Sequence, residues 1–296
     1  MGLLLKRLRK SKGLFDLYSN NIHQYIEKGY ATKLSPIEAS IRTNQTWYLP
    51  HHPVFNENKP GKVRVVFDAA SKFKGVSLNS MLHTGPDLAN NLIGVLIRFR
   101  NFPFTLVADI EGMFHQVRVA DKDKDSLRFL WVEKENSTTF STYEMNVHIF
   151  GATDSPCCAS YALRRTAEDN RKSYIEEAYQ TVLRSFYVDD LLKSLEHDQD
   201  VVNLAHELIS MLHNGGFNLT KFISNSDALV KSLPKSKLAH PLQEINLSSD
   251  LTDRALGISW HVKDDEFLFS SITADQPLTK RGLLKTVSSI LIHLVS

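Results

Sequence analysis

The sequence predicts a globular protein of mixed helices and strands, and three patterns carry this prediction. Apolar residues recur at helical spacing over residues 14–26, and Gly29 is placed to end that helix. The short, partly β-branched run Phe104–Ala108 is typical of a strand buried on both faces. Turn-forming residues at 56–61 and at 264–265 separate strand-like segments, which indicates two β-hairpins.

The remaining elements follow from the same signals. Further helices are predicted over residues 88–99 and 201–212. Another is predicted to begin at Pro156, with Ser155 as the cap of that helix, and a last one over 279–294 is truncated by the chain end. Loops or frayed ends are predicted for the basic start at residues 6–12, for the charged residues 121–125 and for the stretch 224–250.

Composition places the chain in the ordinary globular class. Hydrophobic residues are 42% and charged residues 23% of 296, enough for one large domain or two to three lobes. A net charge of +2 is too small to indicate nucleic-acid binding by itself. The adjacent Cys157 and Cys158 offer neither a disulfide framework nor zinc-finger spacing, which favours a reducing compartment. No targeting segment or membrane span of roughly 20 apolar residues stands out, so no membrane partner is expected.

Two adjacent acids, Asp189 and Asp190, interrupt the apolar run Ser185–Leu192. Ionised carboxylates in such surroundings lose hydration and repel each other unless a cation meets them. A third acid, Asp109, closes the buried strand, and three converging carboxylates would suit Mg²⁺, which takes hard oxygen ligands. Two such ions form the clamp used in phosphoryl transfer. The alternative is a surface hairpin with an Asp-Asp tip, the interpretation that fits Asp264–Asp265.

Two other segments have the chemistry of anion binding. Lys62 and Arg64 share one side of a strand and would suit a polyphosphate, while a solvated strand face is an equally good interpretation. The loop from Phe150 and Gly151 into the helix at Pro156 offers free backbone amides to an anion or a nucleotide, with ordinary helix capping as the alternative.

The order of these segments resembles the reverse transcriptases of LTR retroelements, most closely the Pao/BEL type of LTR retrotransposon polyprotein. The resemblance spans roughly residues 15–292. The segments that carry it are, in chain order, Val63–Asp68, Ala108–Val117, Phe150–Gly151 with Ser155–Pro156, Phe186–Asp190, Gly216–Lys221 and Leu256–Gly257.

The resemblance implies an α+β, right-hand polymerase fold with fingers, a palm carrying a mostly antiparallel sheet, and a partial thumb. The implied domains are the N-terminal helix and fingers (1–84), the first part of the palm (85–120), the second part of the fingers (121–145), the second part of the palm (146–262) and a truncated thumb or connection (263–296). It also implies an intracellular location, in the cytoplasm or in a virus-like particle.

The resemblance assigns the catalytic residues. Asp109, Asp189 and Asp190 match the palm carboxylates that hold two Mg²⁺ ions, and Lys221 matches the lysine proposed to protonate pyrophosphate. Leu256 and Gly257 match the primer grip.

The resemblance also implies a nucleotide pocket. Arg64 matches the arginine that grips the triphosphate, with Lys62 or Lys59 as its companion, and Phe114 matches the steric gate against a ribose 2′-hydroxyl. Phe150 stands where retroviral enzymes carry glutamine. The other matching positions are Ile110, whose backbone carbonyl helps to bind metal, Tyr187, and the pocket residues Gly151 and Pro156.

The function implied is an RNA-directed DNA polymerase that uses dNTPs on a primed RNA or DNA template. The sequence contains no recognisable protease, RNase H or integrase segment, so it resembles a truncated fragment that other domains of a retroelement polyprotein would complete. Two alternatives stay open: a catalytically silent remnant that at most binds nucleic acid, and another magnesium-dependent phosphotransferase.

Overall fold

The computed structural model describes residues 2–10, 13–55, 63–239, 252–255, 258–262, 266–268 and 279. The chain divides into two compact units, residues 1–88 with 112–162, and residues 89–111 with 163–296. Predictions for the hairpin tips at 56–61 and 264–265, for the last helix beyond residue 279, and for Lys59, Lys62, Leu256 and Gly257 lie outside the described residues.

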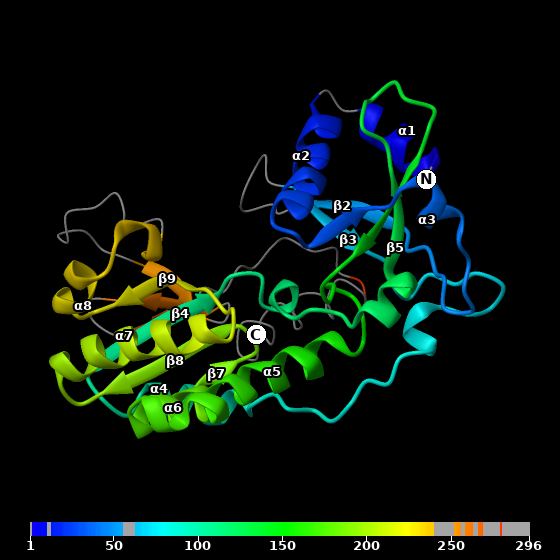
Figure 1. Cartoon of the computed structure of the whole chain (residues 1–296). Coiled ribbons are helices and arrows are strands. Elements are labelled where there is room, and N and C mark those ends of the chain that lie inside the picture. The colour runs from blue at the N-terminus through cyan, green and yellow to red at the C-terminus, as the bar shows by residue number, and fades with distance from the viewer. Residues whose placement is uncertain are drawn as a thin grey trace. The chain divides into compact units, whose positions relative to one another are not determined.

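The first unit contains short helices and two small antiparallel sheets (Figure 1). One sheet has the order β1-β6-β5 and the other pairs β2 with β3. Its elements are α1 (Gly2–Lys10), α2 (Leu14–Glu27), β1 (Ala31–Lys33), α3 (Pro36–Ser40), β2 (His51–Phe55), β3 (Val63–Phe67), η1 (Leu78–Ser80), η2 (Met113–Gln116), η3 (Asp121–Leu127), β5 (Arg128–Trp131) and β6 (Ser141–Met145).

Helix α2 forms much of the core of this unit. Its apolar stripe, predicted from the sequence, is buried, and the ring of Phe15 stacks on that of Trp131 with centroids 5.5 Å apart. Gly29 has φ +71°, a left-handed conformation that glycine adopts without a steric penalty and that stops the helix. The predicted helix over 14–26 and the pairing of β2 with β3 are confirmed.

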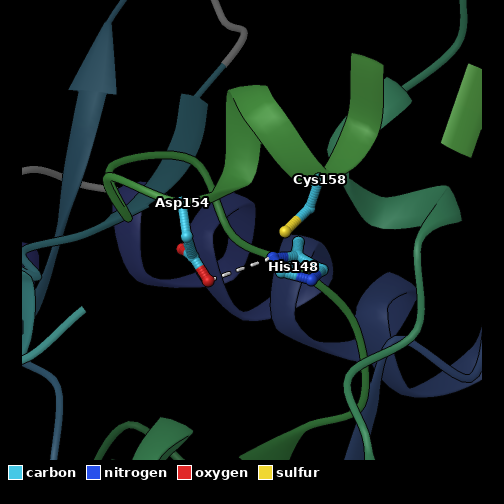
Figure 2. Close-up of side chains that lie close together, drawn as sticks. All are labelled: His148, Asp154 and Cys158. Carbon is cyan, nitrogen blue, oxygen red and sulfur yellow. Dashed lines mark ion pairs between the residues drawn. The ribbon is translucent and has the colours of Figure 1, made fainter. Parts of the chain in front are cut away.

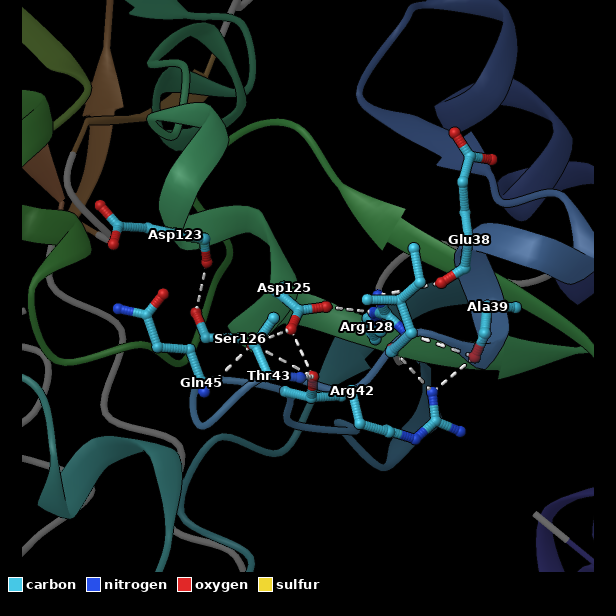
Figure 3. Close-up of polar contacts among 11 residues, drawn as sticks. Glu38, Ala39, Arg42, Thr43, Gln45, Asp123, Asp125, Ser126 and Arg128 are labelled. Atoms are coloured by element: carbon cyan, nitrogen blue, oxygen red, sulfur yellow. Dashed lines mark hydrogen bonds and ion pairs between the residues drawn. The ribbon is translucent and has the colours of Figure 1, made fainter.

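A buried ion pair within residues 125–128 is supported by two hydroxyls from a segment distant in the sequence. Nε of Arg128, in β5, lies 2.5 Å from Oδ1 of Asp125, and the Arg128 residue is only 5% exposed. Figure 3 shows Asp125 also facing Thr43, whose hydroxyl donates to it, as does that of Thr46. Burial alone would raise the pKa of Asp125, but these hydroxyls and the guanidinium together hold it below its ordinary value.

The second unit is built around a four-stranded antiparallel sheet of order β7-β8-β4-β9. Helix α5 (Ser155–Asn170) begins in the first unit and ends in the second. The other elements are α4 (Leu92–Phe99), β4 (Phe104–Ile110), η4 (Arg171–Ser173), α6 (Glu176–Arg184), β7 (Phe186–Tyr187), β8 (Asp190–Leu195), α7 (Asp198–Asn214), β9 (Leu219–Ser224), α8 (Asp227–Ser232), η5 (Lys235–Lys237), β10 (Thr252–Ala255), β11 (Ile258–His261) and β12 (Glu266–Leu268).

Helices cover the central strand of this sheet. Val95 and Phe99 of α4 pack with Val107 of β4, and α7 contacts β4, β8 and β9 (Figure 1). Leu106 to Ala108 are buried, as expected for a strand covered on both faces. The strand predicted at Phe104–Ala108 is therefore confirmed, as are the two predicted helices, although the one predicted over 88–99 begins only at Leu92 and the one predicted over 201–212 extends over Asp198–Asn214.

Three loop predictions were wrong. The basic start forms α1, which buries Leu5 and Leu8 because they lie on one helical face. Residues 121–125 belong to η3, and the stretch after Ser224 contains α8, capped by the Ser226 hydroxyl, which accepts from the Leu229 N–H at 3.0 Å. Within the described residues, every helix is too short or too polar to cross a bilayer.

Candidate functional site

The backbone positions of three acids come together where strands β4 and β8 pair. The antiparallel register places Asp109 opposite Asp190, and Tyr187 pairs with Asp190 across the β7–β8 hairpin. The Ile110 N–H donates to the backbone carbonyl of Asp189 at 2.9 Å, which extends the ladder into the turn. Residues 80 positions apart in the sequence are therefore held at one end of one sheet.

The electrostatics of this cluster disfavour three ionised carboxylates. The pKa of Asp190 is raised to about 7, mainly by burial and then by the negative charges of Asp189 and Asp109. The Lys221 ammonium only partly offsets this increase. A cation placed among these oxygens would favour the ionised carboxylates and so offset the increase in pKa. The donor set is made of carboxylates, which suits a hard divalent ion such as Mg²⁺.

A β-bulge brings Lys221 to the acids. Between Val107 and Asp109, β4 contributes one residue, whereas β9 contributes two, Lys221 and Phe222. Lys221 has φ +55°, the left-handed conformation of the first residue in one class of bulge. Its Nζ lies 2.8 Å from Oδ1 of Asp109, and its side chain is 58% exposed.

The turn that carries the paired acids is strained. Val188 precedes Asp189 in the β7–β8 turn and has φ +54°, a region that β-branched residues rarely occupy. Such a conformation costs on the order of 1–3 kcal/mol and persists only where the surroundings impose it. The short hairpin and the Ile110–Asp189 hydrogen bond supply that constraint.

Sequence reasoning missed a polar network beside the cluster. The Glu111 N–H donates to the Asn218 carbonyl at 3.0 Å, and Asn218 Nδ2 donates to Glu111 Oε2 at 2.7 Å. Lys237 Nζ donates to Asn218 Oδ1 at 2.5 Å and to the Leu219 carbonyl at 2.9 Å. Burial lowers the pKa of Lys237. Lys237 lies in a stretch predicted as a linker, so no local pattern identified it.

The first unit holds a separate group of the predicted site residues. The rings of Phe114 and Phe150 pack with centroids 4.7 Å apart, and His115 meets Phe150 edge-on at 5.2 Å. Gly151 has φ +103°, and a Cβ there would lie 2.8 Å from the Phe67 carbonyl oxygen. Glycine is therefore required at this position by both conformation and space.

The remaining predicted residues of this unit lie on strand β3 and at the start of helix α5. Arg64 is exposed on β3, where Val63 and Val65 face the core. Pro156 is the second residue of α5. Ser155 does not cap the helix as expected, because it is the first residue of α5 and its hydroxyl donates to the Ile149 carbonyl at 2.8 Å.

The structure thus places the predicted residues in two groups, each within its own unit. Asp109, Ile110, Tyr187, Asp189, Asp190 and Lys221 belong to the second unit, and Arg64, Phe114, Phe150, Gly151 and Pro156 belong to the first.

Comparison with solved structures finds foamy viral protease-reverse transcriptases. One, in complex with double-stranded DNA, matches 92% of this chain with a TM-score of 0.57 and 15% identity. A second complex with double-stranded DNA matches 92% of this chain with a TM-score of 0.55 and 17% identity. A complex with an RNA/DNA hybrid matches 91% of this chain with a TM-score of 0.56 and 15% identity. The chain therefore has a reverse-transcriptase-like α+β fold.

The match covers only part of those proteins. This chain spans 39%, 45% and 29% of the three foamy viral chains. No protein-family model matches the sequence, and no curated protein matches it.

Proposed function

We propose that this chain is the reverse transcriptase domain of an LTR retroelement of the Pao/BEL type, an RNA-directed DNA polymerase. The observation that carries the proposal is the grouping of Asp109 and Asp190, on paired strands, with Asp189 of the adjoining turn and with Lys221. The reverse-transcriptase-like fold supports it. In this proposal the chain forms fingers, palm and the start of a thumb, with the boundaries given above.

The acid cluster fits the magnesium ions that such a reaction needs. Its donors are carboxylate oxygens, and burial together with the neighbouring charges of Asp189 and Asp109 raises the pKa of Asp190, an increase that a divalent cation would offset. Asp109, Asp189 and Asp190 would hold two ions. When bound, Mg²⁺ lowers the pKa of a primer 3′-hydroxyl and shields the charge of a triphosphate.

In this proposal, other residues of the chain transfer a proton, bind the triphosphate and select the sugar. Lys221 keeps an ammonium proton close to the carboxylates and would give it to the departing pyrophosphate. Arg64 would hold the triphosphate, and Phe114 would contact the sugar and exclude a ribose 2′-hydroxyl. Substrates would be a dNTP and a primed RNA or DNA template, and other domains of a polyprotein would extend the nucleic-acid contacts.

The test is single-nucleotide incorporation by the purified chain on a primed RNA template with Mg²⁺. We expect incorporation by the parent chain and its loss in Asp189→Asn, with primer-template binding retained. Asp227→Asn, on the exposed start of α8, is the matched control that keeps activity. Incorporation that survives Asp189→Asn contradicts the assigned role. A folded parent that binds the duplex without incorporation favours the silent remnant.

A further inference from the structure

Three different metal-ligating side chains converge in the first unit. In the sequence they alternate with the predicted pocket residues Phe150, Gly151 and Pro156, but none of the three has a role in the proposed polymerase site. They are His148, Asp154 and Cys158, and one ligand atom from each lies within 4.8 Å of the others. Figure 2 shows the Asp154 carboxylate and the Cys158 sulfur both directed at the His148 ring. Their side chains come from one loop and from the first turn of α5.

The fold holds the backbone of this segment in place. The His148 N–H donates to the Val117 carbonyl at 2.9 Å, and the Thr153 N–H donates to Asn79 Oδ1 at 3.1 Å. The Cys158 N–H donates to the Asp154 carbonyl at 3.0 Å, which sets these two residues one helical turn apart on the same face. The cluster is therefore built on a constrained backbone, which is what a preorganised ligand set requires.

The carboxylate of Asp154 lacks the partner that its position would suggest. An aspartate directly before a helix commonly caps it through a backbone N–H. Here Oδ1 is buried and, among the described residues, has no hydrogen-bond partner. Oδ2 lies 3.8 Å from His148 Nδ1, which is too long for a hydrogen bond. A buried carboxylate oxygen in this state is costly unless a cation meets it.

The cluster also borders a cavity. A space of about 290 Å³ is lined by His148, Asp154 and Cys158 together with Arg118 and Asp123. It gives room for a water molecule as a further ligand beside the three side chains.

We propose that His148, Asp154 and Cys158 bind a zinc ion, with a water from the cavity as the fourth ligand. Imidazole, thiolate and carboxylate are the zinc ligands of proteins, and bond lengths of about 2.0–2.3 Å put tetrahedral ligand atoms roughly 3.3–3.7 Å apart. The 3.8 Å between His148 and Asp154 is close to that value, so small rotamer adjustments complete the site. The soft thiolate distinguishes this site from the all-carboxylate cluster.

A bound zinc would tie the segment at His148 to the start of α5. The loop so closed contains Phe150, Gly151 and Ser155. The role inferred is structural, and the proposal is independent of the polymerase assignment because it rests on other residues and another metal.

The experiment uses Co²⁺ as a spectroscopic probe on the untagged full chain with excess Mg²⁺ present. Cobalt bound to a thiolate gives a near-ultraviolet charge-transfer band that carboxylate ligands do not give. The chain has two cysteines, and Cys157 is the matched control because its sulfur lies against Gly85, where an added Cβ would come within 2.5 Å of it. We expect the band at one equivalent in the parent and in Cys157→Ser, and its loss in Cys158→Ser.

Zinc affinity, measured by competition with a chelator, should fall at least about tenfold in Cys158→Ser and in His148→Gln. Circular dichroism checks that each variant is folded. If Cys158→Ser does not fold, X-ray absorption of the zinc-loaded parent decides, and one sulfur ligand is expected. No thiolate band in the folded parent, or a band that persists in Cys158→Ser, overturns the proposal and leaves the cluster as an ordinary helix-start contact.

Discussion

The ammonium nitrogen of Lys221 lies 2.8 Å from Oδ1 of Asp109, and a β-bulge is what puts it there. A regular β9 would alternate its side chains without interruption, whereas the left-handed Lys221 breaks the alternation at this point. One cation is thereby placed beside a cluster of like charges.

Replacing Lys221 by methionine should expose the repulsion within the cluster. Without divalent cations we expect a lower melting temperature, and we expect Mg²⁺ to reduce the difference because it neutralises the same carboxylates. The side chain is 58% exposed, so the loss is below about 1 kcal/mol. Lys231→Met, on exposed α8, is the control. A deficit that Mg²⁺ leaves unchanged would show that Lys221 stabilises the fold in another way.

Asp190→Asn should stabilise the metal-free protein at pH 8. The pKa of Asp190 is raised from 3.8 to about 7, so its folded form binds a proton more tightly, and stability falls as pH rises toward and through 7. The gain in melting temperature, on the order of 2–4 °C per kcal/mol, should therefore be larger at pH 8 than at pH 5. Mg²⁺ should stabilise the parent more than the variant. A gain that is equal at both pH values contradicts this account.

Phe114→Ala should admit ribonucleotides. The proposed gate works by bulk, so the ratio of kcat/KM for a dNTP to that for the matching NTP should fall. Phe150→Ala should lower the ratio less, because it removes the ring that packs on Phe114 at 4.7 Å and leaves the gate itself. The exposed Phe73 provides a control substitution to alanine. An unchanged ratio in an active Phe114→Ala enzyme would remove Phe114 from this role.

Gly151→Ala should destabilise the protein more than Gly29→Ala does. Both glycines have left-handed φ values, +103° and +71°, and alanine in that region costs on the order of 1–2 kcal/mol. Only at Gly151 would the new methyl lie 2.8 Å from a backbone oxygen, whereas at Gly29 it meets no atom of the described residues within 4 Å. Urea unfolding measures the two losses. Equal losses in the free energy of unfolding would mean that the backbone at Phe67 moves away from the new methyl group at little cost.

Asp125→Ala should be strongly destabilising, by about 3–5 kcal/mol, because it removes the ion-pair partner of the buried Arg128. Adding Arg128→Met should recover most of the loss. The pKa of Asp125 is held below its ordinary value of 3.8, so its contribution is complete above that pH and declines as pH falls further. Asp121→Ala, whose side chain is 95% exposed, is the control and should change stability little. A double variant no more stable than Asp125→Ala would contradict the charge argument.

Local patterns in the sequence predicted the elements whose burial depends on neighbouring residues. Helix α2 follows from apolar residues at helical spacing, and strand β4 follows from a short continuous apolar run. The meeting of Asp109 with Asp190 could be anticipated only from the order of motifs, since the pairing of β4 with β8 is a long-range contact.

The features that escaped prediction depend on geometry between distant segments. The position of Lys221 follows from a one-residue irregularity of pairing, and Asp125 meets Thr43 only because residues far apart in the sequence pack together. Cys158 looked like half of an adjacent pair, whereas the fold turns it toward His148 and its neighbour Cys157 toward Gly85. None of these relationships has a sequence spacing that marks it.

The bulge in β9 also limits how this gene segment can evolve. Two residues of β9 face one of β4 there, so the faces of the strand before and after Lys221 are out of step by one position. Loss of the Lys221 codon would restore regular pairing and leave Thr220 opposite Asp109 and Leu219 opposite Ile110, so the sheet would keep its register. The cluster would lose its ammonium, so we expect descendants of this sequence that keep the three acids to keep the extra residue in β9 as well.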